Sequence, residues 1–241
     1  DTMHYKREAD FKPAIEAAAA ADVIVFVGGI SPRLEGEALQ VKVDGFDGGD
    51  KTNLDLPAVQ TALLKELKKT GKPIVLVLMN GSALSINWEN ENMDAIIEAW
   101  YGGEAAGQAI AEVLFGDHNP AGRLPVSFYR SISDIPAFDD YSMKGKTYRY
   151  CEKPVLYPFG YGLSYTKFAY SDLKLSSAVL NEKIEITVTV KNAGRMEGDE
   201  VVQLYIHQQG QTAIKELKGY QRVHLKKGTS KQITFALKPG D

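Results

Sequence analysis

The sequence of 241 residues predicts an open, largely parallel α/β sandwich followed by an all-β sandwich. Helical and strand patterns alternate in the first half, whereas only short alternating strands follow from Phe168 onward. A stretch rich in Pro, Gly and Tyr separates the two patterns. We therefore expect an α/β domain at 1–130, an ordered connector at 131–166 and a β-sandwich at 167–241.

The elements of the first half follow from apolar patterning. Continuous apolar runs rich in β-branched residues, at 22–27 and 74–78, are typical of strands covered on both faces. A third strand is expected at 95–100. Helices are expected at 13–21, at 57–69 and from 104 onward. Repeated strand–helix–strand units imply a parallel sheet with right-handed crossovers.

The second half is expected to be built of short antiparallel strands. Apolar and polar residues alternate at 184–191, 200–207, 217–225 and 232–237. This spacing is typical of an immunoglobulin-like or fibronectin type III sandwich, which has roughly seven strands. Only about five can be counted, so we expect a truncated sandwich. Aromatic residues anchor the connector before it and argue against a floppy linker: Tyr148, Tyr150, Tyr157, Phe159 and Tyr161.

Composition excludes several functional classes. The net charge is −3 without a clustered basic run, so we expect no nucleic-acid partner. The single Cys151 excludes an intrachain disulfide, and the four histidines lack ligand spacing, so we expect no metal and no cofactor. No apolar run is long enough to cross a bilayer, and we expect no membrane partner. Ser82 follows a strand but lacks a nucleophile-elbow pattern, which argues against a serine hydrolase.

The loop after the first strand carries the strongest candidate for catalysis. Residues 28–37 place Glu35 and Glu37 beyond a strand whose carboxyl end is expected to border a binding crevice. If this loop is extended, both side chains lie on one side of the backbone. Two neighbouring carboxylates disfavour joint ionisation, so one could stay protonated and donate a proton. The alternative is an ordinary solvated acidic loop.

Several motifs in order resemble glycoside hydrolase family 3, in particular its β-glucosidase and β-xylosidase members. The matching stretches are 29–37, 49–57, 100–107, 119–125, 157–168 and 200–205. The resemblance implies a (β/α)8 barrel, an α/β sandwich and a fibronectin type III-like domain, of which this chain matches the last two. It also implies an active site where the first two meet, with a nucleophilic aspartate on the barrel.

The resemblance further implies the role of each candidate. Glu37, with Glu35 as the alternative, corresponds to the general acid/base of a retaining, exo-acting β-glycosidase. Arg33, Asp50 and Lys51 are candidates for orienting this acid or contacting sugar hydroxyls. The alternative for Asp50 is a turn cap and for Lys51 a solvated side chain. Half of the catalytic pair is outside the chain, so the chain alone is expected to be inactive.

The expected partners follow from the same resemblance. They are a β-linked oligosaccharide or aryl glycoside and the N-terminal barrel of the same parent chain, in a periplasmic or extracellular bacterial enzyme. The rival hypothesis is a noncatalytic carbohydrate-binding or scaffolding module, because fold alone does not decide function. A barrel with an aspartate at a strand end, upstream in the parent sequence, would discriminate in favour of the hydrolase.

Overall fold

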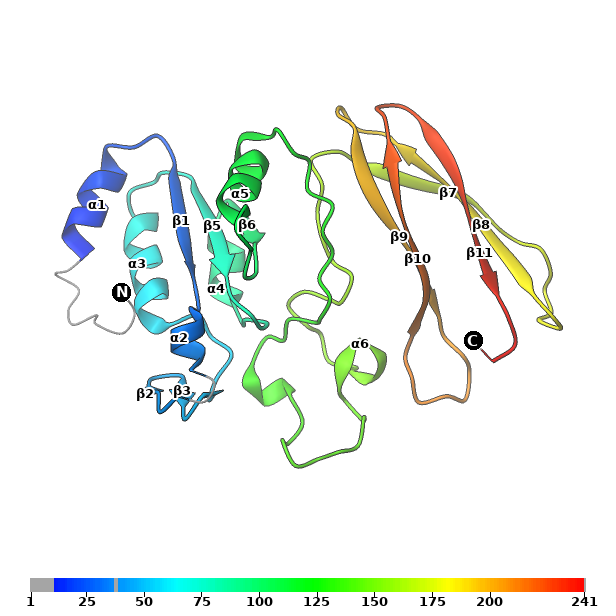
Figure 1. The fold of residues 1–241 in the computed structure, drawn as a ribbon, viewed down its shortest axis with the longest axis horizontal. Coiled ribbons are helices and arrows are strands. Elements are labelled where there is room, and N and C mark those ends of the chain that lie inside the picture. Colours follow the sequence, from blue (N-terminus) through cyan, green and yellow to red (C-terminus); the bar gives the residue numbers. More distant parts are fainter. Residues whose placement is uncertain (1–10, 37–38, 241) are drawn as a thin grey trace. The chain divides into compact units, whose positions relative to one another are not determined.

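The computed structural model describes residues 11–36 and 39–240 (Figure 1). These residues form two compact units. The first unit contains the described residues up to Gln108 together with Phe128–Ala137 and Pro154–Tyr157. The second unit contains Ala109–Ser127, Phe138–Lys153 and the chain from Pro158 onward. The domain boundaries expected from composition, after residues 130 and 166, remain predictions.

The first unit is organised around a parallel three-stranded sheet in the order β1-β5-β6, which confirms the predicted α/β architecture. Its strands are β1 (Ile24–Gly29), β5 (Ile74–Met79) and β6 (Ala95–Glu98). The central strand β5 is covered on both faces, as predicted, because four of its six side chains are fully or almost fully buried. All three strands run the same way, so their carboxyl ends lie at one edge of the sheet.

Strand β1 corrects the prediction of burial on both faces. Val25 is 45% exposed and Val27 is 60% exposed, whereas Ile24 and Phe26 are partly buried. The strand lies at one edge of the sheet, and no other part of the chain that the structure describes covers its valine face. The apolar composition of β1 therefore predicted burial on two faces, whereas the described chain covers only one.

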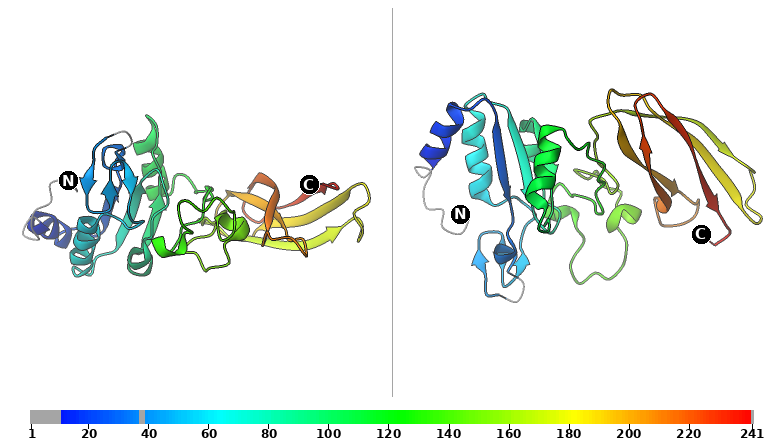
Figure 2. Two further views of the ribbon diagram at one scale, coloured as in Figure 1. Left: turned by 90° about the horizontal axis from the view of Figure 1, so that it is seen from below. Right: turned by 45° about the horizontal axis from the view of Figure 1, so that its top comes forward.

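The expected helices are present in the structure. They are α1 (Lys12–Ala19), α3 (Ala58–Lys68) and α5 (Ala106–Phe115). Helices α1 and α3 lie next to each other (Figures 1 and 2). Leu64 and Leu67 of α3 are buried, and Gln60 exchanges two hydrogen bonds with the backbone of Gly29, at 2.8 and 2.7 Å. These bonds fix α3 against the carboxyl end of β1.

Short elements near the sheet edge were not expected from the sequence. They are α2 (Pro32–Glu35), α4 (Asn87–Asn92) and the small antiparallel strands β2 (Lys42–Val43), β3 (Phe46–Asp47) and β4 (Asp50–Lys51). The carboxyl end of β1 leads through Ile30 and Ser31 directly into α2. The extended backbone that would place Glu35 and Glu37 on one side of the chain is therefore absent over 32–35, which form a helical turn.

The second unit contains the all-β part of the chain, as predicted. Its strands are β7 (Phe168–Leu175), β8 (Ile184–Asn192), β9 (Gly198–Ile206), β10 (Glu216–Leu225) and β11 (Ser230–Leu237). They form one antiparallel sheet in the order β11-β8-β7 and another from β10 and β9. The two sheets share a core of buried aliphatic side chains: Val190, Val202, Val223, Leu225 and Ile233.

The connector is structured and is divided between the two units. It includes a short 3₁₀ turn (Ile132–Asp134) in the first unit and α6 (Thr147–Tyr150) in the second. The ring of Tyr148 stacks on Phe159 with centroids 4.2 Å apart and meets Tyr205 of β9 edge-on. Aromatic packing fixes this segment to the sheet, in agreement with the expectation of an ordered connector.

Candidate active site

The candidate site lies at the carboxyl edge of the sheet in the first unit. Three loops leave this edge: one from β1 into α2, one from β5 through Asn80 and Gly81, and one from β6 through Trp100 and Tyr101. Ligands of open α/β sheets bind at such edges, because the loops there converge from neighbouring strands. The side chains of these loops define what the site can do.

Helix α2 places its acidic residue with local capping. The Ser31 hydroxyl accepts a hydrogen bond from the Leu34 N–H at 3.2 Å, and Leu34 is buried beneath the turn. Gly36 ends the turn at φ +64°, where a Cβ would lie 2.3 Å from a methyl carbon of Val41. The turn therefore holds Glu35 half-buried and leads directly into residue 37.

The predicted acid/base, Glu37, lies outside the described residues. Its alternative, Glu35, is described and faces the loop after β6. The Tyr101 hydroxyl lies within hydrogen-bonding reach of the Glu35 carboxylate and also donates to the Ile30 carbonyl at 2.5 Å. Burial, reinforced by this carboxylate, raises the pKa of Tyr101 well above its usual value. Tyr101 therefore keeps its proton and links α2 to the third strand.

Gly81 allows these groups to come together. A Cβ at this position would lie 2.7 Å from the Tyr101 ring and 3.2 Å from a carboxylate oxygen of Glu35. Its backbone N–H donates to the Tyr101 oxygen. A side chain here would separate the β5 loop from both partners.

Lys51 is brought to the same edge from β4. Its ammonium donates to the Ser82 hydroxyl at 3.1 Å and to the Ala83 carbonyl at 3.2 Å. Burial lowers the pKa of Lys51, and the negative charges of Glu35 and Asp55 oppose this effect. Lys51 thus supplies a partly desolvated cation near Glu35, rather than the solvated side chain of the alternative hypothesis.

The other two predicted contacts are placed differently. Arg33 is exposed on α2, and Asp50 is exposed on β4, where it pairs with Asp47 in the small sheet. Within the described part of the chain, neither side chain shows a hydrogen bond or ion pair to the groups around Glu35. The structure therefore places Lys51 near enough to Glu35 for their charges to interact, and it leaves Arg33 and Asp50 exposed.

Two polar residues at the strand ends were missed by the sequence reasoning. Asn80 is fully buried, and its Nδ2 donates to the Ser82 carbonyl at 2.9 Å and to Glu98 Oε2 at 3.4 Å. Its Oδ1 has no hydrogen-bond partner among the described residues. Burial raises the pKa of Glu98 to about 7, although hydrogen bonds from the Trp100 N–H and Asn80 oppose this shift. The sequence did contain a signal for both residues, because each is a polar residue at the end of an apolar strand.

Trp100 turns the chain between Glu98 and Tyr101. Its φ of +54° lies in the left-handed region, which is uncommon for a residue other than glycine. Its ring meets Phe128 edge-on at 6.0 Å, also within the first unit. Such strain is kept only where the surroundings fix it, and here it directs Tyr101 toward α2.

The arrangement supports proton chemistry by carboxyl groups. No cluster of three or more His, Cys, Asp or Glu side chains that could hold a metal ion occurs among residues 11–36 and 39–240. Two carboxyl groups, one half-buried cation and one tyrosine lie at this edge of the sheet. Residues 3–165 match the model of the glycosyl hydrolase family 3 C-terminal domain.

The chain belongs to glycoside hydrolase family 3. Residues 200–241 also match the model of a fibronectin type III-like domain, which confirms the resemblance and the fold class predicted from the sequence. Among its relatives, a xylan 1,4-β-xylosidase of Xylanibacter ruminicola is 43% identical over 95% of this chain and 27% of its own length. A periplasmic β-glucosidase of Salmonella typhimurium is 42% identical over 93% of this chain and 30% of its own length.

Solved structures give the same assignment. The family 3 β-glucosidase of Bifidobacterium adolescentis superposes with a TM-score of 0.83 at 32% identity, covering 98% of this chain and 36% of that protein. A β-glucosidase of Listeria innocua in complex with glucose gives 0.78 at 31% identity, with 97% and 34% covered. The chain thus spans about a third of the length of the family 3 proteins that it matches. None of its described helices has the length and apolar character to cross a bilayer.

Proposed function

We propose that this chain is the C-terminal part of a retaining, exo-acting β-glycosidase of β-glucosidase or β-xylosidase type. In this proposal it contributes the general acid/base glutamate, Glu37, with Glu35 as the alternative. The nucleophile is an aspartate on a (β/α)8 barrel of the same parent chain. The observation that carries the proposal is the turn α2, which ends at Gly36 immediately before Glu37, at the carboxyl edge of a family 3 α/β sheet.

The surroundings of Glu35 favour Glu37 as the proton donor. The Glu35 carboxylate already faces the Tyr101 hydroxyl and the charge of Lys51. A carboxylate held by its own unit is suited to fixing the turn, because moving it toward a substrate would break these contacts. We therefore assign Glu35 to positioning and Glu37 to proton transfer.

The mechanism then follows from the chemistry of two carboxyl groups. Glu37 protonates the departing glycosidic oxygen while the barrel aspartate attacks the anomeric carbon and forms a glycosyl–enzyme intermediate. Glu37, now ionised, takes a proton from the water that releases the sugar. Retaining chemistry needs the two carboxyl groups about 5 to 5.5 Å apart. The sandwich loop and the barrel must therefore meet for turnover to occur.

The proposed substrates are terminal β-linked glucose or xylose units of oligosaccharides or aryl glycosides. This follows from the names of relatives, which are β-xylosidases and β-glucosidases. The name of one relative also supports the proposal of a periplasmic or extracellular enzyme. Lys51 is proposed to orient the acid loop, and Arg33 and Asp50 to contact sugar hydroxyls from the solvent side.

Azide rescue tests the assignment of the acid/base. The parent enzyme carrying E37Q is assayed with a dinitrophenyl β-glycoside, whose leaving group needs no protonation. We expect slow turnover that azide accelerates, with formation of a β-glycosyl azide, because azide replaces the water that needs a base. The matched control E35Q is expected to show no such acceleration. Rescue of E35Q instead of E37Q would transfer the role to Glu35.

Turnover by the 241-residue chain tests the division of the catalytic pair. We expect no hydrolysis of an aryl β-glucoside or β-xyloside by this polypeptide above the level of its E37Q variant. Hydrolysis clearly above that control would mean that the chain carries both carboxyl groups.

A further inference from the structure

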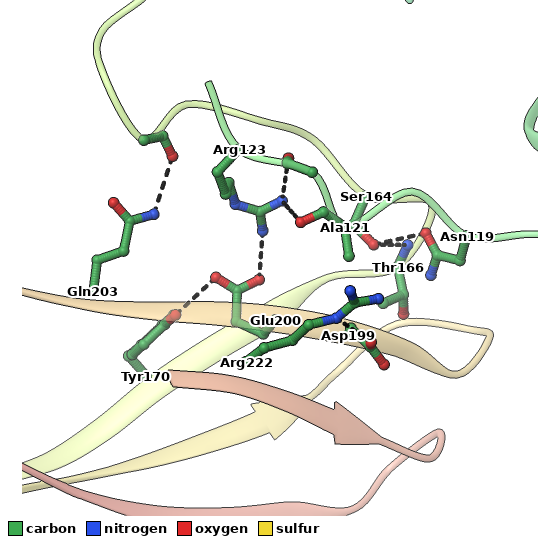
Figure 3. A network of polar contacts seen from close by, with 12 residues as sticks. Asn119, Ala121, Arg123, Ser164, Thr166, Tyr170, Asp199, Glu200, Gln203 and Arg222 are labelled. Atoms are coloured by element: carbon green, nitrogen blue, oxygen red, sulfur yellow. Dashed lines mark hydrogen bonds and ion pairs between the residues drawn. The ribbon is translucent and has the colours of Figure 1, made fainter. Parts of the chain in front are cut away.

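Two partly buried carboxyl groups, one in each unit, have different kinds of partner. Glu200 in the second unit pairs with Arg123 at 2.9 Å and accepts from the Tyr170 hydroxyl at 2.9 Å (Figure 3). This pair of opposite charges is satisfied within the fold. Glu98 in the first unit has no ion pair within the described ranges, and its two oxygens accept from uncharged N–H groups. The proposed reaction gives Glu98 no role of its own.

Glu98 closes the turn that follows β6. Its Oε1 accepts from the Trp100 N–H at 3.2 Å, two residues along the chain. This bond helps to hold Trp100 at a φ of +54°, a backbone conformation that a residue with a Cβ disfavours. The turn directs Tyr101 to the Glu35 carboxylate and to the Ile30 carbonyl. Glu98 therefore supports, through one hydrogen bond, the contact that holds α2.

Asn80 fixes the neighbouring loop, which follows β5. Its side chain is fully buried, and its Nδ2 donates to the Ser82 carbonyl at 2.9 Å. The Ser82 hydroxyl and the Ala83 carbonyl accept from the Lys51 ammonium at 3.1 and 3.2 Å. The same Nδ2 donates to Glu98 Oε2 at 3.4 Å. The loops after β5 and β6 are therefore joined by a side-chain contact where they leave the sheet.

We propose that Glu98 and Asn80 are positioning residues for the acid loop of the glycosidase. The inference rests on the proposed function and deepens it, since it names what holds the proton donor in place. Glu98 acts through Tyr101, and Asn80 acts through the loop that anchors Lys51. Without this pair the two loops relax, α2 loses its fixed neighbours, and the donor is displaced from the glycosidic oxygen.

The oxygens of Glu98 carry this role, rather than its charge. Burial raises the pKa of Glu98 to about 7, so the carboxyl group is partly protonated at neutral pH. A protonated carboxyl group keeps a carbonyl oxygen that accepts a hydrogen bond. Glutamine offers such an oxygen on a side chain of the same length, whereas methionine fills the space without a strong acceptor. E98Q and E98M are therefore a matched pair of variants.

The dependence of kcat/KM on the leaving group tests this proposal in the parent enzyme. E98M is expected to lower kcat/KM about tenfold for a methyl β-glycoside, whose leaving group needs protonation. The leaving group of a dinitrophenyl β-glycoside needs none, so E98M is expected to stay within about twofold of the unchanged enzyme on that substrate. Equal losses on both substrates would mean that Glu98 only supports the fold, and no loss on either would mean that it positions nothing. Each of these results would overturn the proposal.

Three further variants complete the kinetic test. E98Q, and E91Q on an exposed side chain of α4, are expected to stay within about twofold of the unchanged enzyme on both substrates. N80A is expected to show the same selective loss as E98M, by about fivefold. A selective loss in only one of N80A and E98M would contradict a role for the pair. A loss in E98Q as large as in E98M would show that the charge of Glu98, and not its oxygen, matters.

Hydrogen exchange in the parent enzyme separates failure of this inference from failure of the proposed function. The Trp100 and Gly81 N–H groups donate to the oxygens of Glu98 and Tyr101. E98M is expected to speed exchange in the peptides that contain these amides, whereas E98Q leaves them protected. Unchanged exchange in E98M would overturn the inference even if E37Q shows the loss expected of the acid/base. If neither E37Q nor E35Q shows a selective loss on the methyl glycoside, the proposed acid/base assignment fails instead.

Discussion

Two buried asparagines, one in each unit, show the difference between a folding contact and a site. Asn192 ends β8 in the second unit, and Asn80 follows β5 in the first, and both are fully buried. Asn192 Oδ1 accepts from the Thr166 hydroxyl and the Gly194 N–H, and its Nδ2 donates to two carbonyls, at 2.7 to 3.1 Å. Asn80 uses only its Nδ2, and its Oδ1 is unpartnered among the described residues.

The contrast separates a contact that stabilises the fold from one at the candidate site that is incomplete. A fully satisfied buried amide stabilises and specifies a fold, whereas an unsatisfied one costs free energy. The incomplete network lies beside Glu98, Lys51 and the turn that leads to Glu37. We infer that Asn192 holds the loops of the second unit together. In the first unit, Asn80 leaves one hydrogen-bond acceptor unpaired at the sheet edge.

The largest effect on stability is expected when the two asparagines are each replaced by alanine. N192A should lower the free energy of unfolding of the chain by about 4 kcal/mol, because four buried hydrogen bonds are lost. N80A should cost only about 1–2 kcal/mol, since two bonds are lost and one unsatisfied oxygen is removed. Urea unfolding measures both, with the exposed N181A as a control that stays within about 0.5 kcal/mol. Equal losses for N192A and N80A would refute the distinction.

Glu98 should make the stability of the first unit pH-dependent. Its pKa is about 7 in the folded chain against 4.5 as the ordinary value, so the folded state binds the proton more tightly. The resulting stabilisation is complete below pH 4.5 and is lost as the pH rises through 7. The change amounts to at most about 3 kcal/mol. Urea midpoints between pH 4.5 and 8 measure it, and E98Q should abolish this part of the slope. An identical slope in E98Q would show that other groups cause it.

Tyr101 should affect catalysis more than folding. In the parent enzyme, Y101F removes the hydroxyl that faces Glu35 and the Ile30 carbonyl, which loosens α2. We expect kcat/KM to fall about tenfold, mainly through kcat, because a misplaced acid is costly. Steady-state kinetics with Y161F, a tyrosine of the second unit, provides the control. Full activity of Y101F would mean that this contact does not position the acid loop.

The smallest effects are expected at the solvent-exposed candidates. R33Q and D50N in the parent enzyme should raise KM by about threefold and leave kcat unchanged, as expected for exposed groups that contact a sugar hydroxyl. K51Q should instead lower kcat, because Lys51 anchors the loop at Ser82 and Ala83. If all three variants changed kcat and KM in the same way, Lys51 at the sheet edge would have no role different from that of the exposed Arg33 and Asp50.

The sequence predicted the architecture well where local patterning decides it. The buried run at 74–78 forms the central strand, and the four alternating runs of the second half form β8 to β11. Burial of β1 was overestimated, because exposure of Val25 and Val27 depends on neighbouring layers that a strand's own composition does not report. The motifs of family 3 were sufficient to identify the family.

The candidate site was only partly predictable. The signals for α2 were present, since Ser31, Pro32 and Gly36 are an N-cap, a first-turn proline and a C-cap glycine. Four residues are too few for helical periodicity to be visible. The contact of Lys51 with Ser82 joins residues 31 positions apart, and desolvation of Glu98 depends on how β5 and β6 pair. Such features follow from tertiary packing and could not be read locally.

The pH dependence of kcat/KM in the parent enzyme shows which glutamate is the general acid. With an alkyl or weakly activated aryl β-glycoside, activity should fall at high pH as the acid loses its proton. We predict that E37Q loses this basic limb together with roughly 10²–10⁴-fold of its activity, and that E35Q keeps the limb. Retention of the basic limb in E37Q and its loss in E35Q would show that Glu35, and not Glu37, is the proton donor.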